Sequence, residues 1–155
     1  MEGARPARPE ELSRCAELLG DARAALSGRR GGAQLLAVQE WSPGDMAAAW
    51  SAHADRILLA GLIDEVVVGV AAGHLRAGGP GPAPWVGLVD CCYVEPTARG
   101  VGVGTALARA IVEWFTGRGC AGVDVPALPG DRSTKQLFES LGFSARLLIL
   151  HRQVQ

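Results

Sequence analysis

The sequence predicts a single domain of mixed α and β structure, of the α/β (α+β) class, over residues 1–155. Three observations favour this class. Amphipathic helical patterns open the chain, two apolar runs joined by a tight turn follow, and a third apolar run leads through a glycine-rich loop into another helix. A chain of this length buries about 70% of the surface that it exposes when unfolded, so its core needs no disulfide or metal.

Composition excludes several classes of function. The 15 Lys and Arg residues against 16 Asp and Glu give a net charge of -1, which argues against a nucleic-acid partner. The four cysteines form no C-x-x-C pair and have no histidine at metal spacing, so we expect no metal and reduced thiols. The longest apolar runs, residues 57–63 and 66–73, are shorter than the roughly 20 residues that span a bilayer. We therefore expect no membrane contact and a cytoplasmic location.

Two helices are predicted in the first third of the chain. Pro9 stands where a first helical turn tolerates proline, and apolar residues follow at helical spacing, so the first helix covers residues 9–26. The glycine-rich segment 28–32 ends it. Ser42, with Asp45 three residues later, is typical of a helix start and predicts a short second helix that reaches His53.

Strands are predicted next. Residues 57–63 and 65–76 are apolar and meet at Asp64 and Glu65, which predicts an antiparallel hairpin. Residues 78–84 are too rich in glycine and proline for regular structure and form a loop. A third strand follows over residues 85–94.

The most informative segment begins where this third strand ends. Residues 99–104 read Arg-Gly-Val-Gly-Val-Gly, and a helix follows in which Leu107, Ile111 and Phe115 share one face. Free backbone N–H groups at the start of a helix, with no side chains to keep an anion away, favour a phosphate or pyrophosphate site. A plain strand-to-helix turn also favours glycine, but three glycines at alternate positions exceed what a turn needs.

Two other phosphate loops compete for this segment. A Walker A loop needs a lysine before its Ser or Thr, and no lysine stands between Gly104 and Thr105. A dinucleotide fingerprint needs a third glycine where Thr105 or Leu107 stands. Asp124, 20 residues after Gly104, is the one feature that keeps the dinucleotide interpretation open.

The segment resembles the R/Q-x-x-G-x-G/A signature of the GCN5-related N-acetyltransferases (GNAT), whose loop holds the pyrophosphate of acetyl-CoA. Residues 90–96 resemble the family's fourth strand and its exit, and residues 131–143 resemble its closing helix. The resemblance covers residues 85–143. It implies a mixed, mostly antiparallel sheet of six to seven strands with about four helices. The sheet would splay between residues 86–94 and 121–125, where the pantetheine arm inserts.

The resemblance implies an enzyme that uses acetyl-CoA as co-substrate, without a metal, and transfers the acetyl group directly to a primary amine of an unidentified acceptor. The alternative is a catalytically weak acyl-CoA-binding sensor or partner module of the same fold. Many relatives are dimers, so a homodimer stays open. The implied cofactor-binding residues are Cys92, Tyr93 and Val94 in the strand, Arg99, Gly100, Val101, Gly102, Val103, Gly104 and Thr105 in the loop, and Asp131 and Ser133 near the closing helix.

Asp90 is the expected general base, because it stands where the family often carries a catalytic carboxylate. An acid among apolar neighbours is unfavourable to bury without a function, although a solvated or capping role is the alternative. Glu95 and Glu65 are weaker candidates for the base. His74 either faces the acceptor or is an ordinary core or surface histidine.

Several positions leave a choice open. Phe138 stands where the family often has a tyrosine that protonates the departing thiolate, which leaves Ser133, Ser140 or Tyr93 as donors, or none. Asp131 stands where asparagine is common and either contributes to the site or caps the closing helix.

The cysteines and tryptophans leave further alternatives. Strand alternation predicts Cys92 on the face of Asp90 and Cys91 on the other face, and a covalent acetyl-cysteine route is a minor alternative. Trp41 and Trp50 line the acceptor site or pack in the core.

Overall fold

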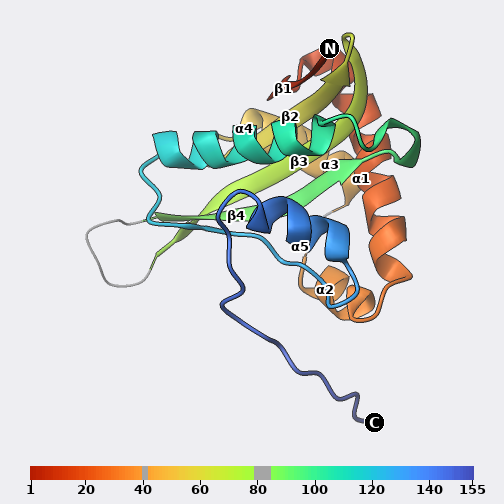
Figure 1. Cartoon of the computed structure of the whole chain (residues 1–155), viewed down its shortest axis with the longest axis vertical. Coiled ribbons are helices and arrows are strands. Elements are labelled where there is room, and N and C mark those ends of the chain that lie inside the picture. The colour runs from red at the N-terminus through yellow and green to blue at the C-terminus, as the bar shows by residue number, and fades with distance from the viewer. Residues whose placement is uncertain (40–41, 79–84) are drawn as a thin grey trace.

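Five strands form one sheet in the order β1-β2-β3-β4-β5, in a computed structural model that describes residues 1–39, 42–78 and 85–155 (Figure 1). Residues 79–84 of the expected loop and Trp41 lie outside the described residues. The strands are β1 (Glu2–Pro6), β2 (Arg56–Ile63), β3 (Val66–Ala77), β4 (Trp85–Val94) and β5 (Val123–Asp124). The helices are α1 (Leu12–Ser27), α2 (Gly32–Val38), α3 (Pro43–Ala52), α4 (Val103–Gly117) and α5 (Arg132–Glu139), with short 3₁₀ turns η1 (Pro9–Glu11) and η2 (Pro96–Ala98).

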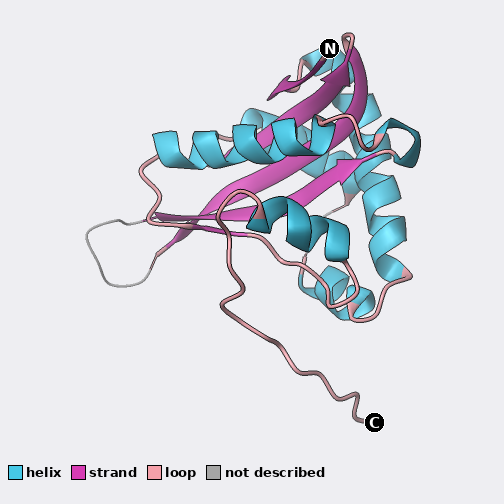
Figure 2. Cartoon of the chain, in the orientation of Figure 1, coloured by secondary structure: helices cyan, strands magenta, loops and turns pink. Residues whose placement is uncertain are grey.

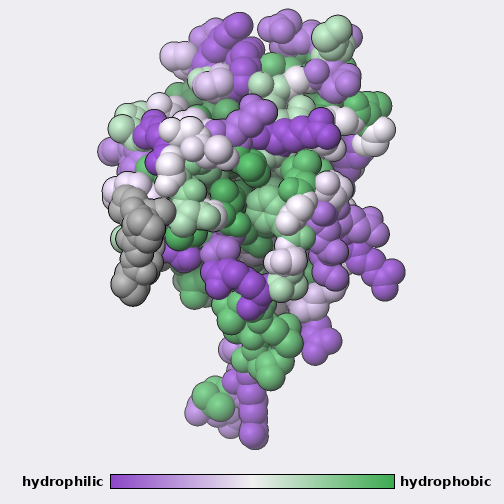
Figure 3. All heavy atoms as spheres, turned by 60° about the vertical axis from the view of Figure 1, so that its left-hand side comes forward, coloured by the Kyte–Doolittle hydropathy of each residue, from purple (hydrophilic) through white to green (hydrophobic). Residues whose placement is uncertain are grey.

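The sheet is mostly antiparallel, as the resemblance implies, and only β4 and β5 run parallel. It has fewer strands in the described residues than the expected six to seven. In the described part of the chain, residues 144–155 pair with no strand and run away from the sheet (Figure 1). Leu147 to Leu150 in this tail are 71–86% exposed and form apolar surface at the lower end of Figure 3.

The predicted helices and hairpin are confirmed within a few residues. Ser42 caps α3, since its hydroxyl accepts a hydrogen bond from the Asp45 amide. The hairpin turn places Asp64 and Glu65 at φ of 47° and 67°, the left-handed geometry of a two-residue turn that suits the twist of the strands. These local signals are strong enough to define the elements before any tertiary contact forms.

Two elements were not expected from the sequence, β1 and α2. β1 has little strand propensity of its own and exists because it pairs with β2, for example Arg5 opposite Ala60. α2 follows Gly31, which takes the left-handed conformation with φ of 80° and redirects the chain after α1. Both elements therefore depend on tertiary contacts and on backbone geometry that periodicity does not detect.

Helices cover both faces of the sheet (Figure 2). On one face, α4 and α5 bury a cluster that contains Leu107, Phe115 and Phe138. On the other, α1 and α3 bury a second cluster that contains Leu18 and Met46. In the part of the chain that the structure describes, no helix is both long and apolar enough to cross a membrane.

Close contact between α4 and the sheet requires glycine in β4. A Cβ atom built at Gly87 would lie 2.5 Å from the ring of Phe115, which is fully buried. We expect Gly87→Ala to lower the free energy of unfolding by about 1–3 kcal/mol, because overpacking forces the ring or the backbone to shift. Denaturant unfolding measures the change. Gly122→Ala is the matched control, since no atom of the described residues lies within 4 Å of its added methyl group. Equal losses in both variants would contradict this account.

An ion pair between Arg5 and Glu11 links β1 to the start of α1. The guanidinium of Arg5 donates to both carboxylate oxygens of Glu11 at 2.9 and 2.7 Å, and the Arg8 amide donates to the same carboxylate at 2.9 Å. The Glu11 side chain is only 13% exposed. The hydrogen bonds from Arg5 lower the pKa of Glu11 from 4.5 to about 2.

This ion pair makes stability depend on pH. Because the folded-state pKa of Glu11 lies below its unfolded value, its contribution is complete above about pH 4.5 and is lost as the pH falls toward 2. We expect Glu11→Gln to remove about 2–3 kcal/mol of stability at pH 7, and the difference from the parent protein to shrink on acidification. Urea unfolding at several pH values tests this. Glu10→Gln, which removes an exposed carboxylate from the same turn, is the control, and a pH-independent loss in Glu11→Gln would contradict the prediction.

Candidate functional site

The sheet opens along one side of β4. β5 pairs with β4 only at Gly87 and Leu88, opposite Val123 and Asp124. β5 ends at Asp124, so from residue 89 onward no strand among the described residues pairs with this edge of β4. An unpaired strand edge presents backbone N–H and C=O groups to any extended ligand that carries amides.

A β-bulge sets the direction of Asp90. On β3, Ala72 pairs with Cys91 and Gly73 pairs with Val89, so Asp90 is an extra residue in β4. The bulge turns Asp90 toward the face that α1 and α3 cover, where Cys91 also packs, whereas Cys92 packs on the face of α4. The expectation that Cys92 shares the face of Asp90 is therefore wrong, because strict alternation fails at a bulge.

The Asp90 carboxylate is buried and hydrogen-bonded. Its Oδ2 accepts from Nε1 of Trp50 at 2.9 Å and lies 2.7 Å from Nδ1 of His74. The Asp90 side chain is 6% exposed, and that of His74 is 29% exposed. The ring of Trp50 thus packs against the second core cluster, and its N–H group donates to the Asp90 carboxylate.

Gln39, at the end of α2, is a site residue that sequence reasoning missed. Its Nε2 donates to the Asp90 carbonyl oxygen at 3.4 Å, which leaves Oε1 as the acceptor atom. Oε1 is buried and finds no hydrogen-bond partner among the described residues. A buried acceptor without a partner is unfavourable, so this atom favours a ligand that carries an N–H group. No motif in the sequence marks Gln39.

The glycine-rich loop exposes the N-terminus of α4. Gly100 and Gly102 have φ of 87° and 100°, a conformation that other residues rarely adopt, and Gly102 is the N-cap. The first hydrogen bond of the helix runs from the Ala106 amide to the Gly102 carbonyl at 3.0 Å. The amides that precede Ala106 in the first turn have no intrahelical acceptor, and the helix dipole adds positive potential there.

Arg99 links the end of β4 to this loop. Its Nε donates to the Val94 carbonyl at 2.7 Å, and its guanidinium lies 5.3 Å from the centre of the Tyr93 ring. These contacts hold a positive charge beside the groove between the strand edge and the helix.

Asp131 caps α5, which is one of the two roles predicted for it. Its carboxylate accepts from the amide and the hydroxyl of Thr134 at 3.2 and 2.7 Å, and Arg29 lies 3.8 Å away. The cap presents Ser133 and Thr134 to the same groove.

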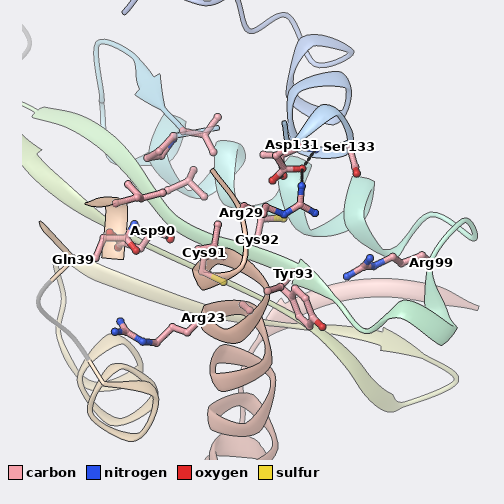
Figure 4. Close-up of a pocket in the computed structure, with 18 residues that line it drawn as sticks. Arg23, Arg29, Gln39, Asp90, Cys91, Cys92, Tyr93, Arg99, Asp131 and Ser133 are labelled. Carbon is pink, nitrogen blue, oxygen red and sulfur yellow. Dashed lines mark hydrogen bonds and ion pairs between the residues drawn. The ribbon is translucent and has the colours of Figure 1, made fainter. Parts of the chain in front are cut away.

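Two adjoining pockets that share lining residues form one groove, and Figure 4 shows the first of them. A first pocket is lined by Gln39, Asp90 and the β4 edge, and a second by the glycine-rich loop and the start of α4; both include Arg99, Ser133 and Thr134. In Figure 4, Asp90 and Gln39 lie at one end and Arg99 at the other. The predicted binding residues that line the groove are Cys92, Tyr93, Val94, Arg99, Gly100, Gly102, Val103, Gly104, Thr105, Asp131 and Ser133. Val101 is exposed and does not line it.

The thiols beside the groove are poor nucleophiles. Burial raises the pKa of Cys91, with smaller contributions from Cys92 and Asp90, and burial alone raises the pKa of Cys92 to about 12. A thiol that stays protonated at neutral pH does not attack a thioester effectively. This disfavours the covalent acetyl-cysteine alternative.

The other candidate acids and donors lie elsewhere. Glu95 is held by Arg14 at 2.5 Å, and Glu65 stands in the exposed hairpin turn. Phe138 is 2% exposed and packs against Phe143 in the core. The hydroxyl of Ser140 donates to a helix carbonyl. Of the hydroxyl groups considered as proton donors, those of Ser133 and Tyr93 belong to groove-lining residues.

The dinucleotide-binding interpretation is wrong. Such folds carry their glycine-rich turn in a parallel sheet, and this sheet is antiparallel except for two residue pairs. Asp124, its supporting residue, is ion-paired with Arg146 and Arg76. Across the described ranges, no group of three His, Cys, Asp or Glu side chains is placed to hold a metal ion.

Comparison with known proteins points to one family. The model of the acetyltransferase (GNAT) family matches residues 25–143. No curated protein matches the sequence.

Solved structures share the fold at low identity. AAC(6')-Iy, in complex with a bisubstrate analogue of CoA and acetylneamine, is 19% identical with a TM-score of 0.72, covering 100% of this chain and 99% of that one. An aminoglycoside acetyltransferase from an uncultured soil metagenomic sample is 19% identical with a TM-score of 0.73 and the same coverage. An acetyltransferase from Trypanosoma brucei is 22% identical with a TM-score of 0.69, covering 99% of this chain and 100% of that one.

Proposed function

Because the chain belongs to the GNAT acetyltransferase family, we propose that it transfers an acetyl group from acetyl-CoA directly to a primary amine. The observation that carries the proposal is the continuous groove from Asp90 to the N-terminus of α4. Its two ends match the two chemical requirements of the reaction, a polar site for the amine and a site for the phosphates of the donor.

The groove suits acetyl-CoA along its length. The unpaired edge of β4 offers backbone hydrogen bonds to the amides of a pantetheine arm. The first-turn amides of α4 and the nearby Arg99 favour a pyrophosphate. The unpartnered Oε1 of Gln39 suits an N–H group of either the arm or the amine.

The reaction needs an unprotonated amine and a means to remove its proton. Asp90 supplies the base function, directly or through another group, because it is the carboxylate that the bulge brings to the acceptor end of the groove. Backbone N–H groups at the β4 edge are the candidates to stabilise the oxyanion that forms on the acetyl group.

The leaving thiolate needs little assistance. A thiol with an ordinary pKa of about 8.5 leaves as thiolate near neutral pH. Phe138 donates no proton, so Tyr93 and Ser133 are the groove residues left for that role. The buried Phe138 also favours the second candidate function, an acyl-CoA-binding module with weak turnover.

The first acceptors to test follow from the neighbouring structures. AAC(6')-Iy is described with an analogue that joins CoA to acetylneamine, and the soil protein is described as an aminoglycoside acetyltransferase. Aminoglycosides are therefore the first acceptors to test, followed by polyamines, amino acids and peptides with free amino groups.

Calorimetric titration with acetyl-CoA, with CoA and NAD as comparators, tests whether the protein binds the proposed donor. Measurement of thiol release after amines are added then tests whether the acetyl group is transferred. Binding of acetyl-CoA with release of CoA in the presence of an amine supports the enzyme. Binding without release of CoA for any amine favours the sensor. Absence of acetyl-CoA binding contradicts both functions.

A further inference from the structure

Gln39 is a groove residue whose hydrogen bonding is incomplete. Its side-chain amide donates one bond, from Nε2 to the Asp90 carbonyl oxygen, and at 3.4 Å this bond is long. Oε1 is buried and has no hydrogen-bond partner in the part of the chain that the structure describes. An orphaned acceptor is unfavourable unless a ligand supplies a donor, so Oε1 indicates a position where a substrate N–H group binds.

Gln39 lies at the end of the groove where the acetyl group is proposed to be transferred. It lines the first pocket, as Asp90 does, and the lining of the second pocket contains neither of them. Figure 4 shows Gln39 and Asp90 at one end and Arg99 at the other. Because the phosphates of the donor are proposed to bind near Arg99, Gln39 stands at the thioester end of the donor.

The chemistry at that end decides which N–H group reaches Oε1. An acetyl thioester carries no N–H group, and an ethylene bridge separates its sulfur from the nearest amide of the pantetheine arm. That amide lies along the edge of β4, where backbone carbonyl groups accept from it in the proposed binding mode. The attacking amine is therefore the N–H donor that remains at the reacting centre.

The amide group of Gln39 is free to turn toward this donor. The last torsion of a glutamine side chain has a broad energy minimum, and the 3.4 Å bond to the Asp90 carbonyl restrains it only weakly. In the free protein Oε1 is closed off from solvent. Turning toward an amine thus gains a hydrogen bond and loses no contact with water.

We infer that Gln39 restricts the acceptor to primary amines; this inference rests on the proposed function. A neutral primary amine has a lone pair and two N–H bonds. The lone pair forms the bond to the acetyl carbon, the carbon–sulfur bond breaks, and CoA leaves as thiolate. One N–H proton passes to Asp90, directly or through another group, and then to solvent or to the thiolate. Oε1 of Gln39 accepts the other N–H, which the amide product keeps.

A secondary amine does not satisfy both positions. Its single N–H must serve the base, so its second alkyl group meets Oε1 of Gln39 and leaves this acceptor unpaired. As the new bond forms, the amine nitrogen becomes positively charged, and hydrogen bonds from charged donors are stronger than those from neutral donors. The discrimination therefore acts mainly on the transition state, and the KM for acetyl-CoA should be the same with both kinds of amine.

Pairs of a primary amine and its N-methyl derivative test the inference, such as glycine with sarcosine and butylamine with N-methylbutylamine. In kcat/KM we expect the parent protein to favour the primary member of each pair that it acetylates by about 10- to 100-fold, the effect of one hydrogen bond to a charged group. Gln39→Met should lower this preference about tenfold or more. Intrinsic reactivity and the folded fraction of each preparation cancel, because the same pair is compared within each protein.

Two further variants separate recognition from structure. Gln34→Met is the matched control, because it makes the same substitution at an exposed glutamine of α2, and it should keep the preference of the parent protein. Gln39→Glu keeps an oxygen acceptor but lacks the Nε2 donor to the Asp90 carbonyl, so it should also keep the preference. Loss of the preference in Gln39→Glu as well as in Gln39→Met would assign the effect to the bond with Asp90 and overturn the inference.

The remaining outcomes distinguish this inference from the proposed function. Equal kcat/KM for both members of each pair in the parent protein, or an unchanged preference in Gln39→Met, overturns the role of Gln39 and leaves acetyl transfer intact. Absence of CoA release by the parent protein with every amine overturns the proposed function itself.

Discussion

Replacing Gly102 by Asp is expected to weaken acetyl-CoA binding about 100- to 1,000-fold. Two like charges about 4 Å apart repel by about 4 kcal/mol at the effective dielectric of a protein surface. Gly102 is the N-cap of α4, at the end of the groove where the phosphates are proposed to bind. Calorimetric titration with acetyl-CoA measures the loss.

Gly102→Asn is the matched control for this variant. Gly102 has φ of 100°, so any side chain strains the backbone, and an added Cβ lies 3.4 Å from Cγ of Glu2. Asn has nearly the same size as Asp and tolerates left-handed geometry, so it reproduces the strain and the contact without the charge. The difference between the two variants isolates electrostatics. Equal affinities in Asp and Asn variants that both remain folded would place the phosphates elsewhere.

The sequence carried enough information for the cofactor end of the groove. Alternate glycines after a strand mark backbone geometry that local residues determine, and Gly100 and Gly102 do adopt positive φ. The cap at Asp131 and the turn at Asp64 and Glu65 are equally local. Such features are predictable because they depend on the φ and ψ angles that one residue type allows, or on a hydrogen bond to a residue close by in the sequence.

The acceptor end could not be predicted in the same way. Whether β4 contains a bulge depends on its pairing with β3, and alternation alone placed Cys92, instead of Cys91, on the face of Asp90. The contacts of Asp90 with Trp50 and His74 join residues 40 and 16 positions apart, and no spacing rule reports them. Gln39 enters the site only because α2 folds against α1. Long-range packing, which a single sequence does not display, builds this half of the site.

Asp90→Asn is expected to lower kcat about 10²- to 10⁴-fold, the range that general acid–base groups contribute, while acetyl-CoA affinity stays within about twofold. The amide keeps the shape of the side chain and an oxygen that accepts from Trp50, but it has no negative charge to hold a protonated partner. The experiment combines thiol-release kinetics with titration of acetyl-CoA. Glu65→Gln removes the exposed carboxylate of the hairpin turn and should leave kcat unchanged.

The two measurements separate chemistry from structure at this position. The phosphate end of the groove is built by the glycine-rich loop and Arg99, which have no bonds to the Asp90 carboxylate. A variant that loses kcat and keeps acetyl-CoA affinity therefore assigns Asp90 to the proton transfer. A variant that loses kcat and acetyl-CoA affinity in parallel shows that Asp90 maintains the structure of β4, because disruption of the bulge would also displace the β4 edge that lines the groove. Unchanged kcat would contradict any role of Asp90 in removing the proton of the amine.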